Sequence, residues 1–215
     1  IRTRCKRLAT HILNNLSPIG IPYELYRVSN KPAPPADIYA PERLRVSDRI
    51  GAGYPEIWAQ QPITRQEMIT DFLEGLCLSY KVTGDTDYLD YAKTVLDSFL
   101  KYSYEPKDGK LYLVDVETGN RLADNDQFQH EATSLLLRAL CVTGKLDIAA
   151  EFAAHFNEYA RENGLFVEWA WLGWRKDHSN KLVLEPATAL LYLYLHTGKR
   201  VYLDWINDYL YVLVK

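Results

Sequence analysis

The sequence predicts an all-α fold of antiparallel helical hairpins. Three times, an apolar helix-like stretch runs into Thr-Gly and restarts as a second helix. The three glycines hold the same place in each copy and lie 54–60 residues apart, a spacing typical of helical-hairpin repeats. In each pair the first helix is apolar nearly all round and the second is amphipathic, which indicates a buried inner layer and a peripheral outer layer. The copies are LCLSYKVTGDTDYLDYAKTVLDSFL (76–100), LLLRALCVTGKLDIAAEFAAHFNEY (135–159) and LLYLYLHTGKRVYLDWINDYL (190–210).

Helix boundaries are marked by local signals. The glycine after each first helix supplies the left-handed residue that ends a helix, and Asp85 can cap the next helix at once. Thr64–Glu67 reads as a capping box, Asp124–Gln127 has the same spacing, and Pro186 fits the first turn of its helix. The expected helices are Arg2–Leu16, Arg65–Val82, Thr86–Tyr102, Asp126–Val142, Leu146–Glu162, Pro186–Leu195 and Arg200–Val214.

These helices predict one α/α-hairpin domain over residues 1–215. Residues 1–17 form an outer helix whose inner partner is absent, and residues 64–215 form three hairpins. Residues 18–63 are rich in proline and lack a helical period, so we expect a long structured loop; loops of this length are usually functional. The predicted fold is an incomplete toroid of about seven helices, and we expect it to be a fragment of a larger toroid or a shorter open array.

The composition and the missing motifs exclude several classes of function. A formal charge of −3 provides no polybasic surface, so we expect no nucleic-acid or membrane partner, and no apolar run is long enough to span a bilayer. Cys5, Cys77 and Cys141 are too scattered for a disulfide framework or a cysteine zinc site, and Cys77 and Cys141 read as buried thiols in matching helices. The P-loop, GxGxxG, GxSxG and HExxH motifs are absent, so we expect no cofactor and no metal.

The chain resembles the six-hairpin glycosidase-like (α/α) toroids. The resemblance lies in the apolar first helix, the TGD or TGK turn, the second helix that opens with YLD, and the aromatic, strand-like segment that follows. That superfamily includes glycoside hydrolases, polysaccharide lyases and sugar epimerases. The resemblance covers about Arg65–Lys215 and implies that a ligand binds where the N-termini of the inner helices meet the preceding loops. Here that end is built from Arg49–Glu67, Leu111–Glu131 and Phe166–Glu185.

The candidate catalytic residues are Asp124, Asp126, His130 and Glu131, at the start of the second inner helix. Sugar hydrolysis needs one protonated and one ionised carboxyl group, and a crowded helix mouth can separate the pKa values of two such groups. His130 lies four residues after Asp126, so the two share a helix face. The alternative is structural, with the aspartates as helix caps and His130 as a satisfied core histidine.

Two further segments carry candidate substrate-binding residues. In the segment before Pro186, aromatic side chains could stack on sugar rings or, alternatively, fill the end of the helical array. Glu185 in this segment could bind substrate or, alternatively, stabilise a helix N-terminus. In the other, Arg49 could neutralise a uronate carboxylate, although a packed connecting loop explains the same residues. The candidates are Glu168, Trp169, Trp171, Trp174 and Glu185 in the first segment, and Arg49, Tyr54, Glu56 and Trp58 in the second.

The sequence therefore favours a carbohydrate-active enzyme, or part of one, that acts on an oligosaccharide or uronate-containing glycan. Hydrolysis by a carboxyl pair is the first choice, and lyase or epimerase chemistry with His130 or a tyrosine as base is the second. A non-catalytic helical-repeat module that binds a peptide or protein is the alternative from another class. An incomplete toroid leaves inner-helix surface open, so we expect a homo-oligomer or a missing N-terminal half.

Overall fold

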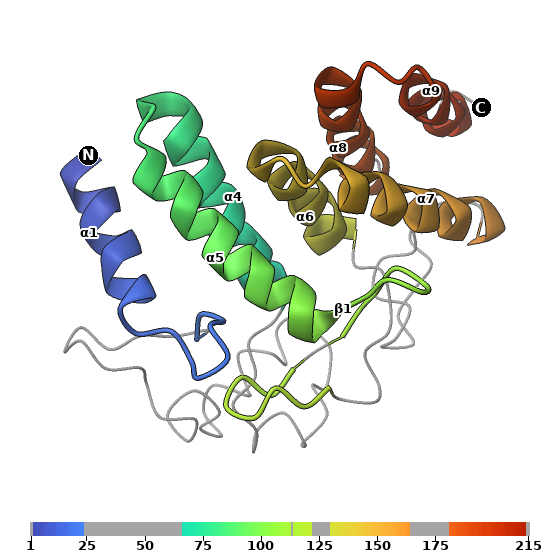
Figure 1. Cartoon of the computed structure of the whole chain (residues 1–215). Helices are drawn as coiled ribbons and strands as arrows, with labels where there is room; N and C mark the ends of the chain where they lie inside the picture. The colour runs from blue at the N-terminus through green and yellow to red at the C-terminus, as the bar shows by residue number, and fades with distance from the viewer. Residues whose placement is uncertain (1, 24–65, 113, 122–129, 164–180, 214–215) are drawn as a thin grey trace.

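A computed structural model of the chain describes residues 2–23, 66–112, 114–121, 130–163 and 181–213 (Figure 1). Within these ranges it contains seven helices and one small antiparallel sheet. The elements are α1 (Arg2–Leu13), α4 (Gln66–Thr83), α5 (Thr86–Ser103), β1 (Tyr104–Glu105), β2 (Lys110–Leu111), α6 (His130–Thr143), α7 (Leu146–Asn163), α8 (Lys181–Thr197) and α9 (Val201–Leu213).

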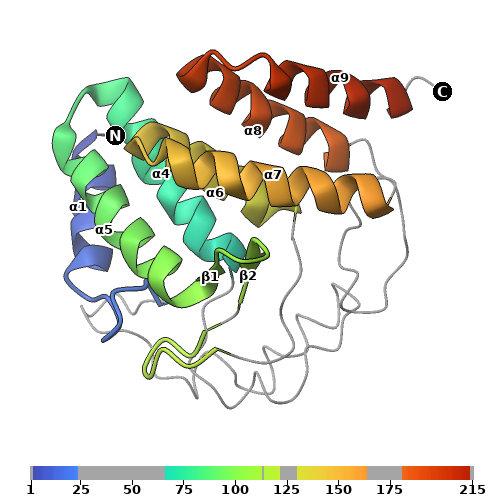
Figure 2. The same cartoon turned by 45° about the vertical axis from the view of Figure 1, so that its right-hand side comes forward.

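The helices form two layers. In the inner layer α4, α6 and α8 lie side by side and run in the same direction, with α6 in contact with both of the others (Figure 2). Each returns through a short turn into α5, α7 or α9, which packs antiparallel on the helix before it. The predicted all-α class is confirmed, and the described helices form an incomplete (α/α) toroid of hairpins.

The three Thr-Gly turns share one set of interactions. Each glycine has a φ between 68° and 81°, a backbone conformation that glycine adopts without strain. Each threonine hydroxyl donates a hydrogen bond to the carbonyl four residues earlier, which satisfies a carbonyl near the helix end. These bonds are Thr83 to Ser79 at 2.6 Å, Thr143 to Ala139 at 2.8 Å and Thr197 to Leu193 at 2.7 Å.

The core lies between the two layers. Leu136, Leu137 and Leu140 of α6 are fully buried, as are Phe152 and Phe156 of α7. The positions predicted to face this core do so: Cys77, Cys141 and Leu193 have exposed fractions of 3%, 2% and 0%. Burial raises the pKa of the Cys77 thiol to about 11 and that of Cys141 to about 12, so both stay protonated and unreactive near neutral pH.

Helix α1 lies next to α5 as an additional outer helix (Figure 1). Ala9 is buried in the common core, and Lys6 Nζ lies 2.8 Å from Asp85 Oδ2 and 2.6 Å from Asp87 Oδ2. Asp85 caps α5 as predicted, because its Oδ1 accepts a hydrogen bond from Asp87 N at 3.2 Å. The ion pairs therefore join α1 to the start of α5.

Two helix boundaries differ from the expected ones by three residues or more. Helix α1 ends at Leu13, three residues early, and the chain then makes a tight turn in which Ser17 Oγ accepts from Ile21 N at 3.2 Å. Helix α8 begins at Lys181, so Pro186 lies inside the helix and the prediction of a first-turn proline was wrong. The apolar run Leu182–Leu184 continues the inner-helix pattern ahead of the proline, which explains the earlier start. Helix α6 is described from His130, and Asp126 lies outside the described residues.

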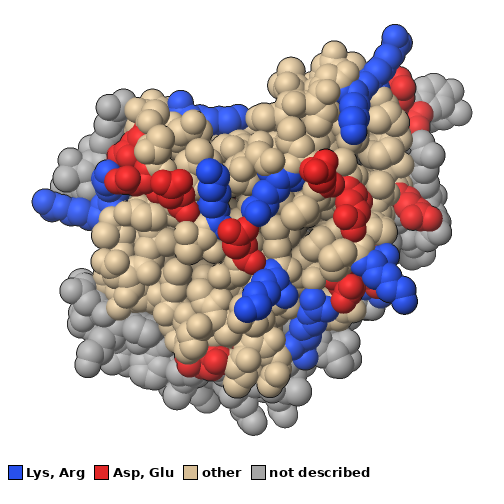
Figure 3. Space-filling model, in the orientation of Figure 1, with Lys and Arg blue, Asp and Glu red and all other residues tan. Residues whose placement is uncertain are grey.

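The outer surface is mixed in charge. Lysine and arginine are interspersed with aspartate and glutamate over α1, α5 and α7 (Figure 3). A surface of this kind suits an amphipathic outer layer and provides no single-sign field. Among the described helices, none is both long enough and apolar enough to cross a bilayer.

Replacing Cys77 by aspartate tests the inner-layer assignment. The change places an unpaired carboxylate at a site that is 3% exposed, so we expect the free energy of unfolding to fall by about 3 kcal/mol or more. Val82→Asp is the matched control on the same helix, because Val82 is 76% exposed, and it should cost less than about 1 kcal/mol. Chemical denaturation of both variants makes the comparison, and equal losses would contradict the assignment.

Candidate functional site

The three inner helices begin at the same end of the array. Helices α4, α6 and α8 start at Gln66, His130 and Lys181, and their parallel alignment gathers three helix N-termini there (Figure 2). Free backbone N–H groups and the positive ends of helix dipoles favour anionic groups at such a place. Each of the three segments that carry the sequence candidates ends at one of these N-termini, so this end is the candidate site.

A β-hairpin forms part of the described base of this end. Strands β1 and β2 pair Tyr104 with Leu111 and Glu105 with Lys110, directly after α5. The buried Gln66 side chain, at the start of α4, donates a hydrogen bond from Nε2 to the carbonyl of Leu111. The first inner helix is therefore joined to the connection that leads toward the second. The aromatic, strand-like segment predicted after α5 corresponds to this hairpin.

A tight turn extends the base beyond β2. The Asp115 carboxylate accepts hydrogen bonds from the N–H groups of Glu117 and Thr118 at 2.9 and 3.0 Å, an arrangement that aspartate favours in turns. Val114 and Arg121 form an isolated antiparallel bridge across the turn. The Tyr23 hydroxyl donates to Glu117 Oε1, so the segment after α1 is tied to the same turn.

Arg121 fixes the end of this connection. Its Nε donates to the carbonyl of Tyr102 at 2.9 Å, and its Nη2 donates to the carbonyl of Tyr104 at 2.7 Å. Its Nη1 lies 2.8 Å from Glu105 Oε2, and the guanidinium stacks 4.9 Å from the ring centroid of Tyr112. The hydrogen bond from Arg121 holds the pKa of Glu105 below its ordinary value. Arg121 therefore anchors the chain three residues before candidate Asp124.

The candidate residues themselves are only partly described. His130 and Glu131 form the first turn of α6, and Glu185 belongs to the first two turns of α8, with the backbone alone described for these three. His130 and Glu131 stand at the start of an inner helix, whereas Glu185 is the fifth residue of α8 rather than part of the loop before it, because α8 begins at Lys181. The other candidates lie outside the described residues and stay predictions: Arg49, Tyr54, Glu56, Trp58, Asp124, Asp126, Glu168, Trp169, Trp171 and Trp174.

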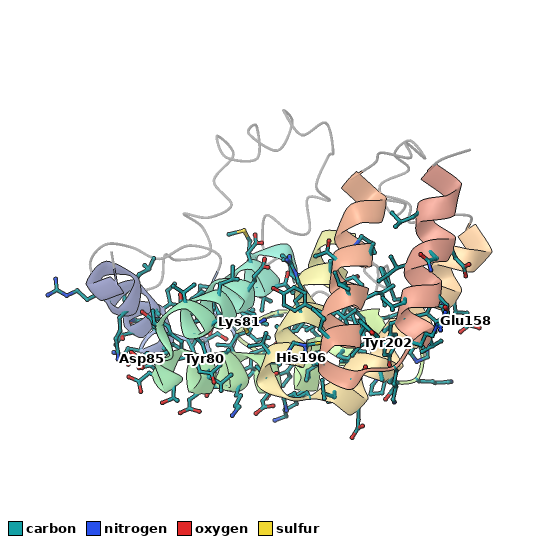
Figure 4. The ribbon with its side chains drawn as sticks, turned by 90° about the horizontal axis from the view of Figure 1, so that it is seen from above. Tyr80, Lys81, Asp85, Glu158, His196 and Tyr202 are labelled. Carbon is teal, nitrogen blue, oxygen red and sulfur yellow. The ribbon has the colours of Figure 1, made fainter. Side chains whose placement is uncertain are left out.

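The structure brings together a second cluster, which sequence reasoning missed, on the face of the inner layer. Arg138 of α6 pairs with Glu74 of α4, with Nη1 2.8 Å from Oε1. Lys81 Nζ lies 4.4 Å from the ring centroid of Tyr192 on α8, and the ring of His196 stacks on the same tyrosine at 6.2 Å. Lys81 and His196 are labelled in the view from above (Figure 4). The available signal was a single charged residue within an apolar run of each helix, Glu74 within residues 72–78 and Arg138 within residues 135–141.

In this inner-face cluster (Glu74, Lys81, Arg138, Tyr192 and His196), Glu74, Arg138 and Tyr192 are half-buried, whereas Lys81 and His196 are exposed. Burial raises the pKa of Glu74, and the nearby positive charge of Arg138 opposes that shift. Arg138 Nε is buried and has no hydrogen-bond partner among the described residues. Three inner helices therefore contribute to one polar patch, which links them across the inner layer. In the described part of the chain, no group of His, Cys, Asp and Glu side chains is arranged to hold a metal ion.

Comparison with known sequences gives no assignment, because no protein-family model and no curated protein matches the chain.

Three solved structures are similar to the chain in fold. A GH76 α-mannanase from Bacteroides thetaiotaomicron has a TM-score of 0.49 and 16% identity over 67% of this chain and 39% of its own. An unsaturated glucuronyl hydrolase from Bacillus sp. GL1, described as responsible for the degradation of glycosaminoglycan, has a TM-score of 0.49 and 16% identity over 74% of this chain and 46% of its own. A sugar epimerase from a ruminal bacterium has a TM-score of 0.48 and 18% identity over 98% of this chain and 68% of its own.

All three proteins have the six-hairpin toroid architecture that the sequence resembles. The chain spans less than half the length of the mannanase and of the glucuronyl hydrolase. With TM-scores below 0.5, these similarities concern the arrangement of helices and carry no argument about activity or substrate.

Replacing Arg121 by lysine tests whether this residue anchors the connection. Lysine keeps the charge but cannot reproduce the planar fork that reaches two carbonyls, so we expect a loss of about 1–2 kcal/mol in unfolding free energy. Amide hydrogen exchange at Tyr112 and Val114 should also accelerate. Arg200→Lys is the control, because the Arg200 side chain is 87% exposed and reaches only Asp204 in the described structure. Equal effects of the two changes would contradict the anchoring role.

The same anchor should respond to acid. The folded pKa of Glu105 is lower than its ordinary value of 4.5, so its bond to Arg121 contributes stability above that pH and loses it as the pH falls through the folded pKa. We expect amide exchange at β1 and β2, corrected for intrinsic rates, to increase as the pH falls from 4.5 through the lower pKa of folded Glu105. In Glu105→Gln this acid-dependent increase should be absent, and its persistence there would rule out Glu105 as the titrating group.

Proposed function

We propose that the chain is a carbohydrate-active enzyme, or part of one, that acts on an oligosaccharide or uronate-containing glycan at the N-terminal end of its inner helices. The observation that carries this proposal is topological. The starts of α4, α6 and α8 lie at one end of a rigid helical layer, and the three segments richest in carboxylate and aromatic candidates each end there. Polar loops above an apolar scaffold are where binding and catalytic residues concentrate.

Hydrolysis is the reaction we favour. Asp126 and Asp124 precede α6 in the chain, and Glu131 belongs to its first turn, so several carboxyl groups are available close to one helix N-terminus. The positive end of the helix dipole stabilises an ionised carboxylate, whereas crowding of carboxylates raises the pKa of a neighbour. One group could then protonate the leaving oxygen while the other acts as base or nucleophile. His130 offers an alternative base for lyase or epimerase chemistry.

Substrate recognition is assigned to the two other segments. Trp169, Trp171 and Trp174 precede α8, and indole rings stack on the apolar faces of sugar rings. Arg49 lies in the segment that precedes α4, and its guanidinium suits the carboxylate of a uronate. The hairpin base with Arg121 supports this proposal because it fixes the chain shortly before Asp124.

A second candidate function is a non-catalytic module that binds a protein partner along the inner layer, for which a second copy of the chain is the first choice. The observation in its favour is the exposure of large apolar side chains on the inner helices: Leu78, Val82 and Leu195 are 45%, 76% and 69% exposed. Apolar surface of this kind often marks an interaction site. Light scattering tests this candidate. It predicts a dimer that Leu195→Lys converts to monomer, and a monomeric parent chain would count against a second copy.

Asp126→Asn tests the enzyme proposal. Asparagine keeps the shape and most of the capping ability of aspartate, so the melting temperature should stay near that of the parent. Removal of a catalytic acid or base should lower turnover by about 10²–10⁴-fold on a panel of neutral and uronate oligosaccharides. Trp171→Ala should weaken saccharide binding in calorimetry while the fold stays intact.

The control for this experiment is Asp90→Asn, on the exposed face of outer helix α5, which should change neither melting nor turnover. Two results would overturn the proposal. The first is a parent chain that binds no saccharide. The second is an Asp126→Asn variant whose activity falls only in proportion to its stability, because a helix cap alone explains that outcome.

A further inference from the structure

The structure contains a cleft at the opposite end of the array from the candidate site. It lies between α1 and the turn from α4 to α5, and its volume is about 540 Å³. Thr83, the last residue of α4, contributes to its wall. Asp85, beside α1 in Figure 4, and Tyr88 of α5 also line it. A cavity of this volume is in the range of small-molecule sites.

One wall of the cleft is a polar face of α1. Arg7 and Thr10 line the cleft and are three residues apart on one face of α1. Asn14, which also lines the cleft, directly follows α1 and continues this face, because its N–H donates to the Thr10 carbonyl at 3.0 Å. Within the part of the chain that the structure describes, the Arg7 guanidinium has no ion-pair or hydrogen-bond partner. The residues that border the cleft therefore include an arginine, whose side chain is a planar cationic donor, together with a hydroxyl and an amide further along the chain.

The other charges at the cleft are already paired. Asp85 accepts from Lys6 Nζ at 2.8 Å and from Asp87 N at 3.2 Å, and Lys6 also contacts Asp87. The hydrogen bond from Lys6 lowers the pKa of Asp85, which keeps this carboxylate ionised and engaged. Tyr88 is only 3% exposed and supplies a largely apolar surface beneath the polar wall. Arg7 is thus the side chain in position to accept a new anionic group.

We propose that this cleft binds a small organic carboxylate of about the size of one sugar ring. The Arg7 guanidinium would form paired hydrogen bonds to the ligand carboxylate, a geometry that arginine favours. Thr10 and Asn14 would bond to hydroxyl groups of the ligand, and Tyr88 would contact its apolar side. This site is separate from the proposed saccharide site, because it lies at the C-terminal end of α4 rather than at its start.

Titration with glucuronate and with glucose tests the proposal, since the two rings differ in the carboxylate at the sixth carbon. Calorimetry should detect glucuronate binding and much weaker glucose binding. Arg7→Gln should weaken glucuronate binding at least about tenfold, because charge-assisted bonds are lost. Arg200→Gln, an exposed arginine at the turn from α8 to α9, should bind like the parent. The Asn14 side-chain amide resonances should shift on addition of glucuronate to the parent and not to Arg7→Gln.

Several results would overturn the proposal: no glucuronate binding by the parent, equal affinity for glucose, unchanged affinity in Arg7→Gln, or no shift at Asn14. Retained binding in Arg7→Gln would place the ligand elsewhere and leave the proposed saccharide site untouched. Loss of turnover in Asp126→Asn with Arg7-dependent binding intact would support both sites independently. Arg7 is exposed, so its replacement should not alter folding, and equal melting temperatures of the parent and Arg7→Gln verify this.

Discussion

The burial of α6 between α4 and α8 is the constraint on which the rest of the structure depends. Leu136, Leu137 and Leu140 have no exposed surface, so α6 cannot leave without exposing a large part of the core. Neighbours on both sides fix its direction, and the parallel inner layer follows from that contact. The outer helices then cover the remaining apolar surface of each pair. The position of every helix N-terminus at the candidate end is set by this packing.

The hairpins could be predicted from the sequence because their determinants are local. A threonine and a left-handed glycine end each inner helix within two residues, and Asp85 caps the next helix. The start of α8 was predicted wrongly because a local signal was misleading. Pro186 is typical of a first helical turn, but the apolar run before it extends the helix. The pairing of Glu74 with Arg138 was also out of reach, since it joins residues far apart in the chain.

The candidate site shows the same division. Its location at the inner-helix N-termini could be predicted, because each long connection must end at one of them. The role of Arg121 could not, because its two carbonyl partners lie 17 and 19 residues earlier and only the β-hairpin brings them close. Loop geometry depends on such contacts between residues distant in the chain, and the hydrophobic periodicity of the sequence does not predict them. The chemistry assigned to Asp124, Asp126 and the tryptophans therefore rests on residue type and position in the chain.

The contrast between the two ends of the array has a consequence for how such a protein can change. At one end, each hairpin closes through a short Thr-Gly turn in which the threonine hydroxyl donates to a carbonyl of the preceding helix. An insertion there would disrupt the turn and this hydrogen bond. At the other end, the connections start and finish on helices that are already packed. A lineage of such chains could thus exchange or lengthen one connection without rebuilding its neighbours. Changes in loop length are therefore tolerated at the end that carries the candidate site, whereas the end with the Thr-Gly turns tolerates few of them.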